Sequence, residues 1–223
     1  MTTRFITLAA TLLLAAAVPA AASAAQIQTD RACYLENSGN VSVSGTGFAP
    51  GQPYQVTLDG KPLAGATGTT DAAGGVTGSF AMPKLAGARE QAHALGIVQG
   101  ANAPTTGFSV TTFNADFTPG SGNPKTLRVR FKVNGFGLVD PNPVVYVHYV
   151  RPNGKVKRTT RLGKAQGVCG QIKQTSRKRL FPFNAERGKW KLQFDTQKKY
   201  VKGVKGADFL YYTIGVTIKK VFA

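Results

Sequence analysis

Short stretches in which apolar and polar residues alternate recur along the whole chain, and this period of two predicts β-strands. The stretch TLRVRFKV (126–133) has an apolar residue at every second position and cations at most positions between them, and KWKLQFD (189–195) follows the same rule. Glycine and proline account for 26 and 12 of the 223 residues, which favours many short strands over long helices. Further strands are predicted at 54–58, 76–82, 93–98, 107–113, 144–150 and 210–220.

The strand pattern contains an internal repeat. The segments NVSVSGTGFAPGQPYQVT (40–57) and RVRFKVNGFGLVDPNPVV (128–145) align with a shift of 88 residues. The aligned positions are Val41 with Val129, Val43 with Phe131, Gly47 with Gly135, Phe48 with Phe136 and Pro53 with Pro141. They are the positions that a strand and its following turn need most: inward apolar residues, a glycine at the bend and a proline where the next strand begins.

Six or seven short strands per repeat are typical of an immunoglobulin-like sandwich, so the sequence predicts an all-β protein with two tandem immunoglobulin-like β-sandwich domains. The domains are expected at 25–113 and 114–223. The boundary is expected near FTPGSGNP (117–124), whose Gly, Pro, Ser and Asn content indicates a linker or loop.

Residues 1–24 have the layout of a cleaved signal peptide. Arg4 precedes an apolar run from Phe5 to Val18, and small residues ending in Ala22-Ser23-Ala24 follow. We therefore expect a secreted protein, extracellular or associated with a cell surface, in which no later segment is apolar for long enough to span a membrane. In that oxidising environment the two cysteines, Cys33 and Cys169, are predicted to form a disulfide; free thiols or links between molecules are the alternatives.

The stretch VSVSGTGFAPGQPYQVTLDG (41–60) resembles the immunoglobulin-like (Big-type) modules of secreted and surface proteins of bacteria, in which a strand ends in a G-x-G-F-x-P-G turn. The resemblance covers about 80 residues and implies a fold with no catalytic content. The turn is also similar to that of the neocarzinostatin-type chromophore carriers, which implies a small-ligand cleft in the first half as an alternative. The second half resembles a divergent partner of the first.

Charge divides the chain into two unlike halves. Residues 25–111 contain 4 Lys and Arg against 5 Asp and Glu, whereas residues 112–223 contain 23 against 5. The whole excess of +18 therefore belongs to the second half. Where the first copy of the repeat places Ser42 and Ser44 on its outward face, the second places Arg130 and Lys132, so the fold itself does not require these cations.

The excess charge predicts a polyanion-binding surface, because a polymer with regularly spaced anions relieves the repulsion between neighbouring cations and releases counterions. A hairpin is predicted at RPNGKVKRTTRLGK (151–164). In it, Lys155, Lys157, Thr159 and Arg161 are expected on one face and Val156, Arg158, Thr160 and Leu162 on the other. The predicted binding residues are Arg128, Arg130, Lys132, Lys155, Lys157, Arg158, Arg161, Lys164, Lys189 and Lys191, with aromatic contacts from Tyr146 and Tyr149.

The sequence offers little for catalysis. The two histidines, His93 and His148, each lie in an apolar strand pattern that favours a core or edge position over a base or ligand. No hydrolase, zinc or phosphate-loop motif is present, and Cys169 is assigned to the disulfide instead of a thiol nucleophile. We expect no enzyme activity, catalytic residue, metal or cofactor.

The leading hypothesis is therefore a binding module for anionic polysaccharides or another polyanion of a wall or envelope. Nucleic acid is a less favoured polyanion, since counterion release does not distinguish between polymers. A structural spacer or adhesion protein, in which the charge serves only solubility, and the small-ligand carrier are the alternatives. The oligomeric state does not follow from the sequence.

Overall fold

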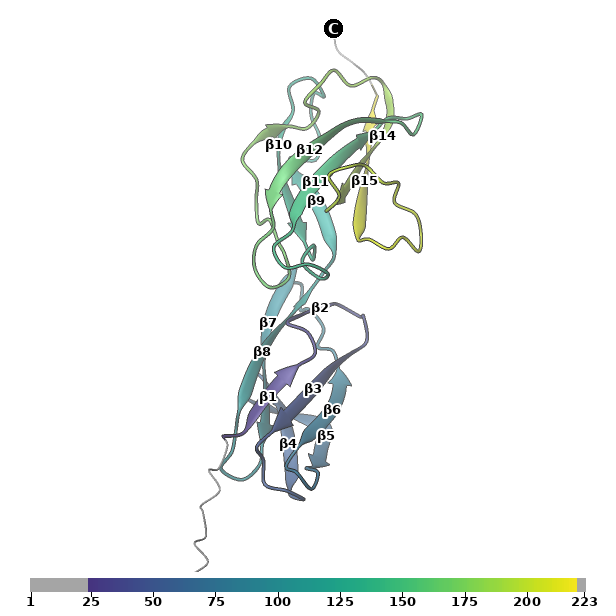
Figure 1. The fold of residues 1–223 in the computed structure, drawn as a ribbon. Helices are drawn as coiled ribbons and strands as arrows, with labels where there is room; N and C mark the ends of the chain where they lie inside the picture. Colours follow the sequence, from purple (N-terminus) through teal and green to yellow (C-terminus); the bar gives the residue numbers. More distant parts are fainter. Residues whose placement is uncertain (1–23, 220–223) are drawn as a thin grey trace, which may run out of the picture.

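The computed structural model describes residues 24–219, and no helix occurs in that range. The chain forms two all-β lobes joined end to end (Figure 1). The predicted signal peptide lies outside the described residues except for Ala24. No described helix is long and apolar enough to cross a membrane.

The first half contains eight strands in two sheets, of three and five strands. The strands are β1 (Gln26–Thr29), β2 (Cys33–Leu35), β3 (Asn40–Thr46), β4 (Pro53–Leu58), β5 (Lys61–Thr69), β6 (Val76–Ala81), β7 (Glu90–Val98) and β8 (Thr105–Thr111). The sheet orders are β1-β3-β6 and β2-β8-β7-β4-β5. All pairings are antiparallel except β2 with β8.

The second half contains seven strands, also in two sheets. They are β9 (Asn114–Thr118), β10 (Arg128–Asn134), β11 (Val144–Val150), β12 (Val156–Lys164), β13 (Lys178–Arg179), β14 (Gly188–Asp195) and β15 (Tyr211–Ile218). The sheet orders are β13-β10-β9 and β12-β11-β14-β15.

These orders show that the two halves share one topology. Reading β1, β3 and β6 as β9, β10 and β13, and β5, β4, β7 and β8 as β12, β11, β14 and β15, reproduces every antiparallel neighbour. The predicted all-β fold with two immunoglobulin-like sandwiches is confirmed. Two strands differ: β13 has two residues where β6 has six, and β2 has no counterpart in the second half.

The aligned positions of the internal repeat have the same structural roles in both halves, except for the proline. Val41 and Val129 are fully buried, and Gly47 and Gly135 have φ angles of 82° and 79°, a left-handed conformation that favours glycine. The aligned Phe48 and Phe136 are both buried, Phe136 in the core of its half. The proline match is wrong, because Pro53 begins β4 whereas Pro141 lies in a bend before β11.

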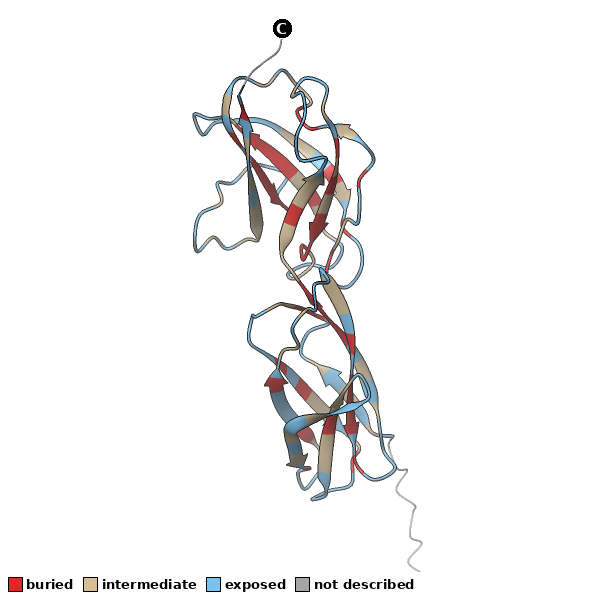
Figure 2. Cartoon of the chain, turned by 180° about the vertical axis from the view of Figure 1, so that it is seen from behind, coloured by how far each residue is buried: buried red, intermediate tan, exposed pale blue. Residues whose placement is uncertain are grey.

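Each half has its own hydrophobic core, seen as buried stripes inside each lobe (Figure 2). In the second half, β10 contributes Val129, Phe131 and Val133, and β11 and β14 contribute apolar residues to the same core from the facing sheet. The outward faces of the two sheets therefore point in opposite directions, which determines where the charged residues lie.

The junction between the cores is short. Val110 belongs to the first core, and Phe113 already packs against the second. The segment FTPGSGNP does not separate the halves as expected: Phe117 and Thr118 belong to β9, and 119–124 lies in the connection from β9 to β10.

A disulfide fastens the junction. Cys33 in β2 and Cys169 in the segment between β12 and β13 are bonded with a Cα–Cα distance of 5.3 Å and a sequence separation of 136. Both residues are buried. The predicted pairing is confirmed, and it links the two halves to each other.

Candidate functional site

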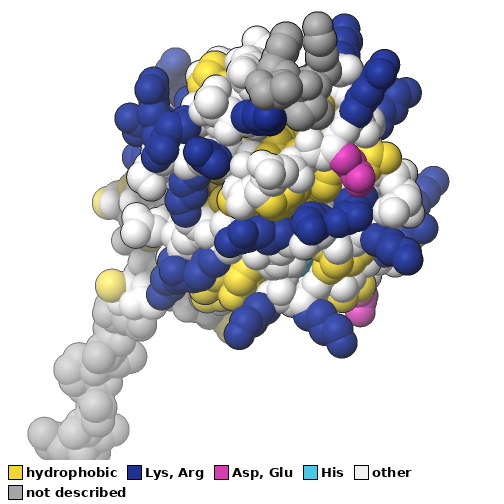
Figure 3. Space-filling view, turned by 90° about the horizontal axis from the view of Figure 1, so that it is seen from above, with side chains coloured by type: hydrophobic (Ala, Val, Ile, Leu, Met, Phe, Trp, Pro, Cys, Tyr) yellow, Lys and Arg dark blue, Asp and Glu magenta, His cyan; other side chains and the backbone are white. Residues whose placement is uncertain are grey.

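The cations of the second half lie at its surface and are largely uncompensated. None of the Lys and Arg side chains from Lys125 to Lys219 is buried, and viewed down the long axis they form a dark band across the molecule with few acidic side chains beside it (Figure 3). In this described range only Arg151 forms an ion pair, with Glu186 at 4.0 Å. These charges are therefore exposed to solvent and give the surface a strongly positive electrostatic potential.

The acidic residues of this half explain the lack of compensation. Asp195 is fully buried, and Asp116 of β9 pairs with Arg89 of the first half. Of the five Asp and Glu of this half, only Asp140, Glu186 and Asp208 are exposed, against 23 Lys and Arg. Cations on the same face of a strand lie about 6.6–7 Å apart, within the Debye length of about 8 Å, so they repel one another when nothing is bound.

The predicted binding residues fall on two opposite faces. Arg128, Arg130 and Lys132 alternate with the core residues of β10 and point outward from the sheet β13-β10-β9. Lys189 and Lys191 alternate with core residues of β14 and point outward from the other sheet. The hydrophobic core lies between these sets, so the ten predicted cations do not form one groove.

The second strand of the predicted hairpin, β12, is an edge strand whose pairing with β11 has two irregularities. Lys155, Lys157, Arg158, Arg161 and Lys164 are all exposed along β12 or its turn. The pairing of β11 with β12 shifts register at Val145/Tyr146 and at Tyr149/Val150.

These shifts change the expected alternation of the hairpin. Val156 was expected on the apolar face but is 41% exposed, because the second shift pairs it with Val150. Arg158 keeps the face expected for it, and its guanidinium donates to the carbonyl of Pro182 at 3.2 Å.

The two predicted aromatic contacts behave differently. Tyr146 lies opposite Arg161 on the outward face and is half-buried. Tyr149 is only 1% exposed, and its ring packs against Phe181 and Phe183. Burial raises the pKa of the Tyr149 phenol above its ordinary value. Tyr149 is therefore a core residue, and its predicted role as a ligand contact is wrong.

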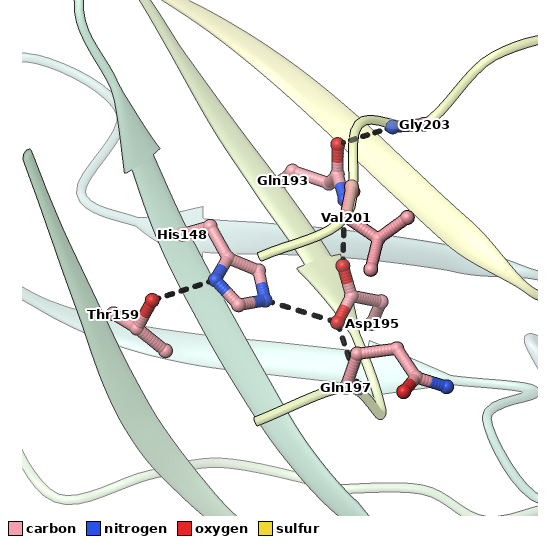
Figure 4. A network of polar contacts seen from close by, with 7 residues as sticks. All are labelled: His148, Thr159, Gln193, Asp195, Gln197, Val201 and Gly203. Carbon is pink, nitrogen blue, oxygen red and sulfur yellow. Dashed lines mark hydrogen bonds and ion pairs between the residues drawn. The ribbon is translucent and has the colours of Figure 1, made fainter. Parts of the chain in front are cut away.

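A buried polar network covers the outward face between β11 and β14 (Figure 4). His148 Nε2 lies 3.0 Å from Asp195 Oδ1, and His148 Nδ1 lies 2.7 Å from the Thr159 hydroxyl. The side-chain amide of Gln193 donates both to Asp195 and to the carbonyl of Val201, each at 2.7 Å. Both ring nitrogens of His148 thus have partners.

The network holds the 196–210 segment against the sheet. The backbone amides of Gln197 and Gly203 donate to Asp195 and to Gln193, at 2.8 Å and 3.0 Å, and the ring of Tyr200 lies 5.4 Å from that of His148. The two histidines are buried, as their apolar strand patterns predicted. In this environment His148 positions a loop.

The same loop carries four cations that the sequence reasoning missed. Lys198, Lys199, Lys202 and Lys205 are all exposed on it. Their density over eight residues is a signal in the sequence, but the segment has no alternation of apolar and polar residues and therefore belongs to no predicted strand face. With Lys189 and Lys191 they extend the basic surface of the sheet β12-β11-β14-β15, which we call the loop-side basic face.

The junction contains a smaller polar cluster. A pocket of about 400 Å³ is lined by Arg89, Glu90 and Lys132 together with Ala92, Asn134, Gln171 and Lys173. One carboxylate oxygen of Glu90 is buried without a hydrogen-bond partner, and burial raises the pKa of this side chain. Lys173 opposes that shift through its charge.

No grouping for metal binding occurs among the described residues, since no three His, Cys, Asp or Glu side chains lie together there. The cavity of about 390 Å³ in the first half is lined mainly by polar residues, including Gln26, Gln28, Ser44, Asp71 and Thr77. This lining does not suit the apolar small molecule that the carrier alternative requires.

Comparisons with known proteins find no matching family model and no matching curated protein. Among solved structures, the chain is similar to a tetra-tandem repeat from the extending region of a large adhesion protein (13% identity, TM-score 0.29), covering 89% of this chain and 50% of that one. It is similar to the D0-D1 domain of Intimin (12%, 0.33), covering 86% and 98%. It is also similar to a Ca²⁺-stabilised ice-binding adhesin of an Antarctic bacterium (15%, 0.32), covering 89% and 49%. TM-scores of this size establish neither a common fold nor a common function.

Proposed function

We propose that this chain is an extracellular, non-enzymatic binding module whose basic second half attaches to anionic polymers of a cell surface or wall. The observation that carries the proposal is the contrast between two lobes of one topology, one with 4 Lys and Arg and the other with 23. Because the first lobe folds around the same strand order without the cations, they serve something other than the fold.

The arrangement of the cations favours diffuse electrostatic attachment. They are exposed, nearly unpaired and divided between two outward faces, so a flexible polyanion gains by contacting many of them in turn. This kind of attachment does not require a narrow groove that recognises one specific arrangement of sugars. Nucleic acid offers the same spacing of charge, so the polymer class is decided by experiment.

The loop-side basic face gives the sharpest test. Replacing Lys198, Lys199, Lys202 and Lys205 with Ser removes four exposed charges without touching the buried His148–Asp195 network. We expect binding to polygalacturonate at 0.1 M salt to weaken by at least tenfold.

The matched control replaces Lys61 and Lys84 of the first half with Ser, and its expected affinity is within twofold of the parent's. Single-stranded DNA serves as the second polymer, and tighter binding to it than to polygalacturonate would redirect the proposal to nucleic acid. Unchanged binding by the four-lysine variant would contradict electrostatic attachment through this face.

A structural spacer is the second candidate, and the fastened junction favours it. The Cys33–Cys169 disulfide and the Arg89–Asp116 ion pair both connect the two lobes. In that case replacing Arg128, Arg130 and Lys132 with Ser leaves retention at the cell surface unchanged, whereas binding through these cations requires that retention falls.

A further inference from the structure

One strand of the first half, β2, has no counterpart at the equivalent position of the second half. In the first half, β2 lies along the outer edge of β8, in parallel, with Cys33 opposite Ser109 and Leu35 opposite Thr111. The equivalent edge belongs to β15, which ends its sheet. The segment 119–127, which corresponds in order to the chain around β2, forms no strand.

An apolar groove lies at that vacant position. It has a volume of about 410 Å³ and lies between the 120–124 segment and residues 215–219, which are the end of β15 and the residue after it. Its apolar lining comes from Phe117, Leu127, Leu180, Phe181 and Val216. These residues belong to the second core or pack against it, so the groove is an opening into the side of that core.

The first half shows what closes such an opening. Tyr34, in the middle of β2, is 3% exposed, and its ring lies edge-on to that of Phe108 at 5.6 Å. Backbone bonds fix the segment on both sides: the amide of Ser109 donates to Ala32, and that of Glu36 donates to Thr111, each at 2.9 Å. The closing segment is thus extended and has an aromatic residue at its centre.

The free edge of β15 lacks the protection that the other edge of the same sheet has. The opposite edge strand, β12, carries Lys157, Arg158, Arg161 and Lys164 and two register shifts. From Tyr211 to Ile218, β15 contains no charge and no proline, and its pairing with β14 has no register shift. Unprotected edges of this kind pair with other strands.

We propose that the edge of β15 is a docking site for an extended segment of a partner protein, with a central aromatic residue and acidic residues on both sides. The aromatic side chain enters the groove, and the backbone pairs in parallel with the end of β15, as β2 does with β8. An acidic flank suits the rim, where Lys219 lines the groove. In the first half, Asp30 and Glu36 precede and follow β2.

The probe for this site is a peptide copied from the first half, residues 30–36 with Ser in place of Cys33 (Asp-Arg-Ala-Ser-Tyr-Leu-Glu). Binding to the full chain is measured by fluorescence anisotropy at 0.5 M salt, where diffuse charge attraction is screened. We expect at least tenfold tighter binding than for a scrambled peptide of the same composition, and a similar loss when Ser replaces the tyrosine.

The blocking variant is Gly120→Trp. Gly120 lines the groove and has open space where a side chain would begin, so a large side chain fits there without disturbing the core. We expect at least tenfold weaker peptide binding. The matched control is Ser176→Trp, at an exposed position that does not line the groove, with unchanged binding expected.

Four outcomes would overturn the proposal. The proposed site is wrong if the ordered and scrambled peptides bind equally well. It is also wrong if the Gly120→Trp variant and the parent bind the peptide equally well. Dimerisation of the free chain at micromolar concentration that Gly120→Trp abolishes identifies a second copy as the occupant. At least tenfold tighter peptide binding after deletion of residues 220–223 assigns the groove to the chain's own C-terminal end.

Discussion

Removing the Cys33–Cys169 disulfide is expected to destabilise the second lobe strongly, because the bond connects parts of the chain that are distant in sequence. The perturbation is the double substitution Cys33→Ala and Cys169→Ala. Cys169 is fully buried and Cys33 nearly so, and neither has another covalent role. Alanine keeps both positions apolar and leaves no reactive thiol.

The magnitude follows from the length of chain that the bond closes. When the whole chain unfolds, the closed loop spans 136 residues, for which the chain-entropy model gives about 5 kcal/mol. When only the second lobe unfolds, Cys33 stays fixed in the folded first lobe, and the free loop runs from Thr112 to Cys169, roughly 60 residues. The same relation then gives about 4 kcal/mol.

The assay uses the single tryptophan, Trp190, which lies in the core of the second lobe and reports its unfolding specifically. Urea denaturation followed by Trp190 fluorescence should show a free energy of unfolding lower by about 4 kcal/mol in the double variant. A loss below about 1 kcal/mol would refute the reasoning, since it would mean that the bond does not restrict the unfolded second lobe.

Three further predictions concern individual side chains. Tyr149→Ala should lower the free energy of unfolding by about 3–5 kcal/mol in urea denaturation, because the ring is buried; a loss below 1 kcal/mol would contradict its core position. Asp195→Ala should release the 196–210 loop, so that trypsin cleaves at Lys198 and Lys199 at least tenfold faster than in the parent; equal cleavage would contradict the network's role. Burial raises the pKa of Glu90, so its ionised form costs stability at neutral pH and this cost disappears as the pH falls below its ordinary value of 4.5. Glu90→Gln should therefore raise the melting temperature at pH 7 and leave it nearly unchanged at pH 4, and the opposite pH dependence would contradict the shift.

The strands and the repeat were predictable because they depend on local patterns. Alternation located β10 and β14, and the glycine-phenylalanine pair at 47–48 and 135–136 marked the same turn in both lobes. The disulfide was predictable because a chain with two cysteines and a predicted signal peptide has one internal pairing available. These inferences need no knowledge of which strands are neighbours.

The candidate surface was less predictable because it depends on pairings between distant segments. Which sheet holds β10 and which holds β14 is decided by the sheet order, and this order separates Arg130 from Lys191. Tyr149 is two residues from Val147 and four from Val145, so all three lie on one face of β11. Tyrosine also occurs at surfaces, so this pattern alone did not establish that Tyr149 is buried. The cover of the 196–210 loop over His148 left no local pattern at all.

The central claim is that exposed, unpaired cations of the second lobe attach the protein to a polyanion. The most direct measurement is the affinity of the full chain for polygalacturonate from 0.05 to 0.5 M salt. Electrostatic attachment through many cations predicts that log K falls steeply and linearly with log salt, with a shallower slope after the four loop lysines are replaced. An affinity that does not change with salt, or no binding even at 0.05 M, would contradict it.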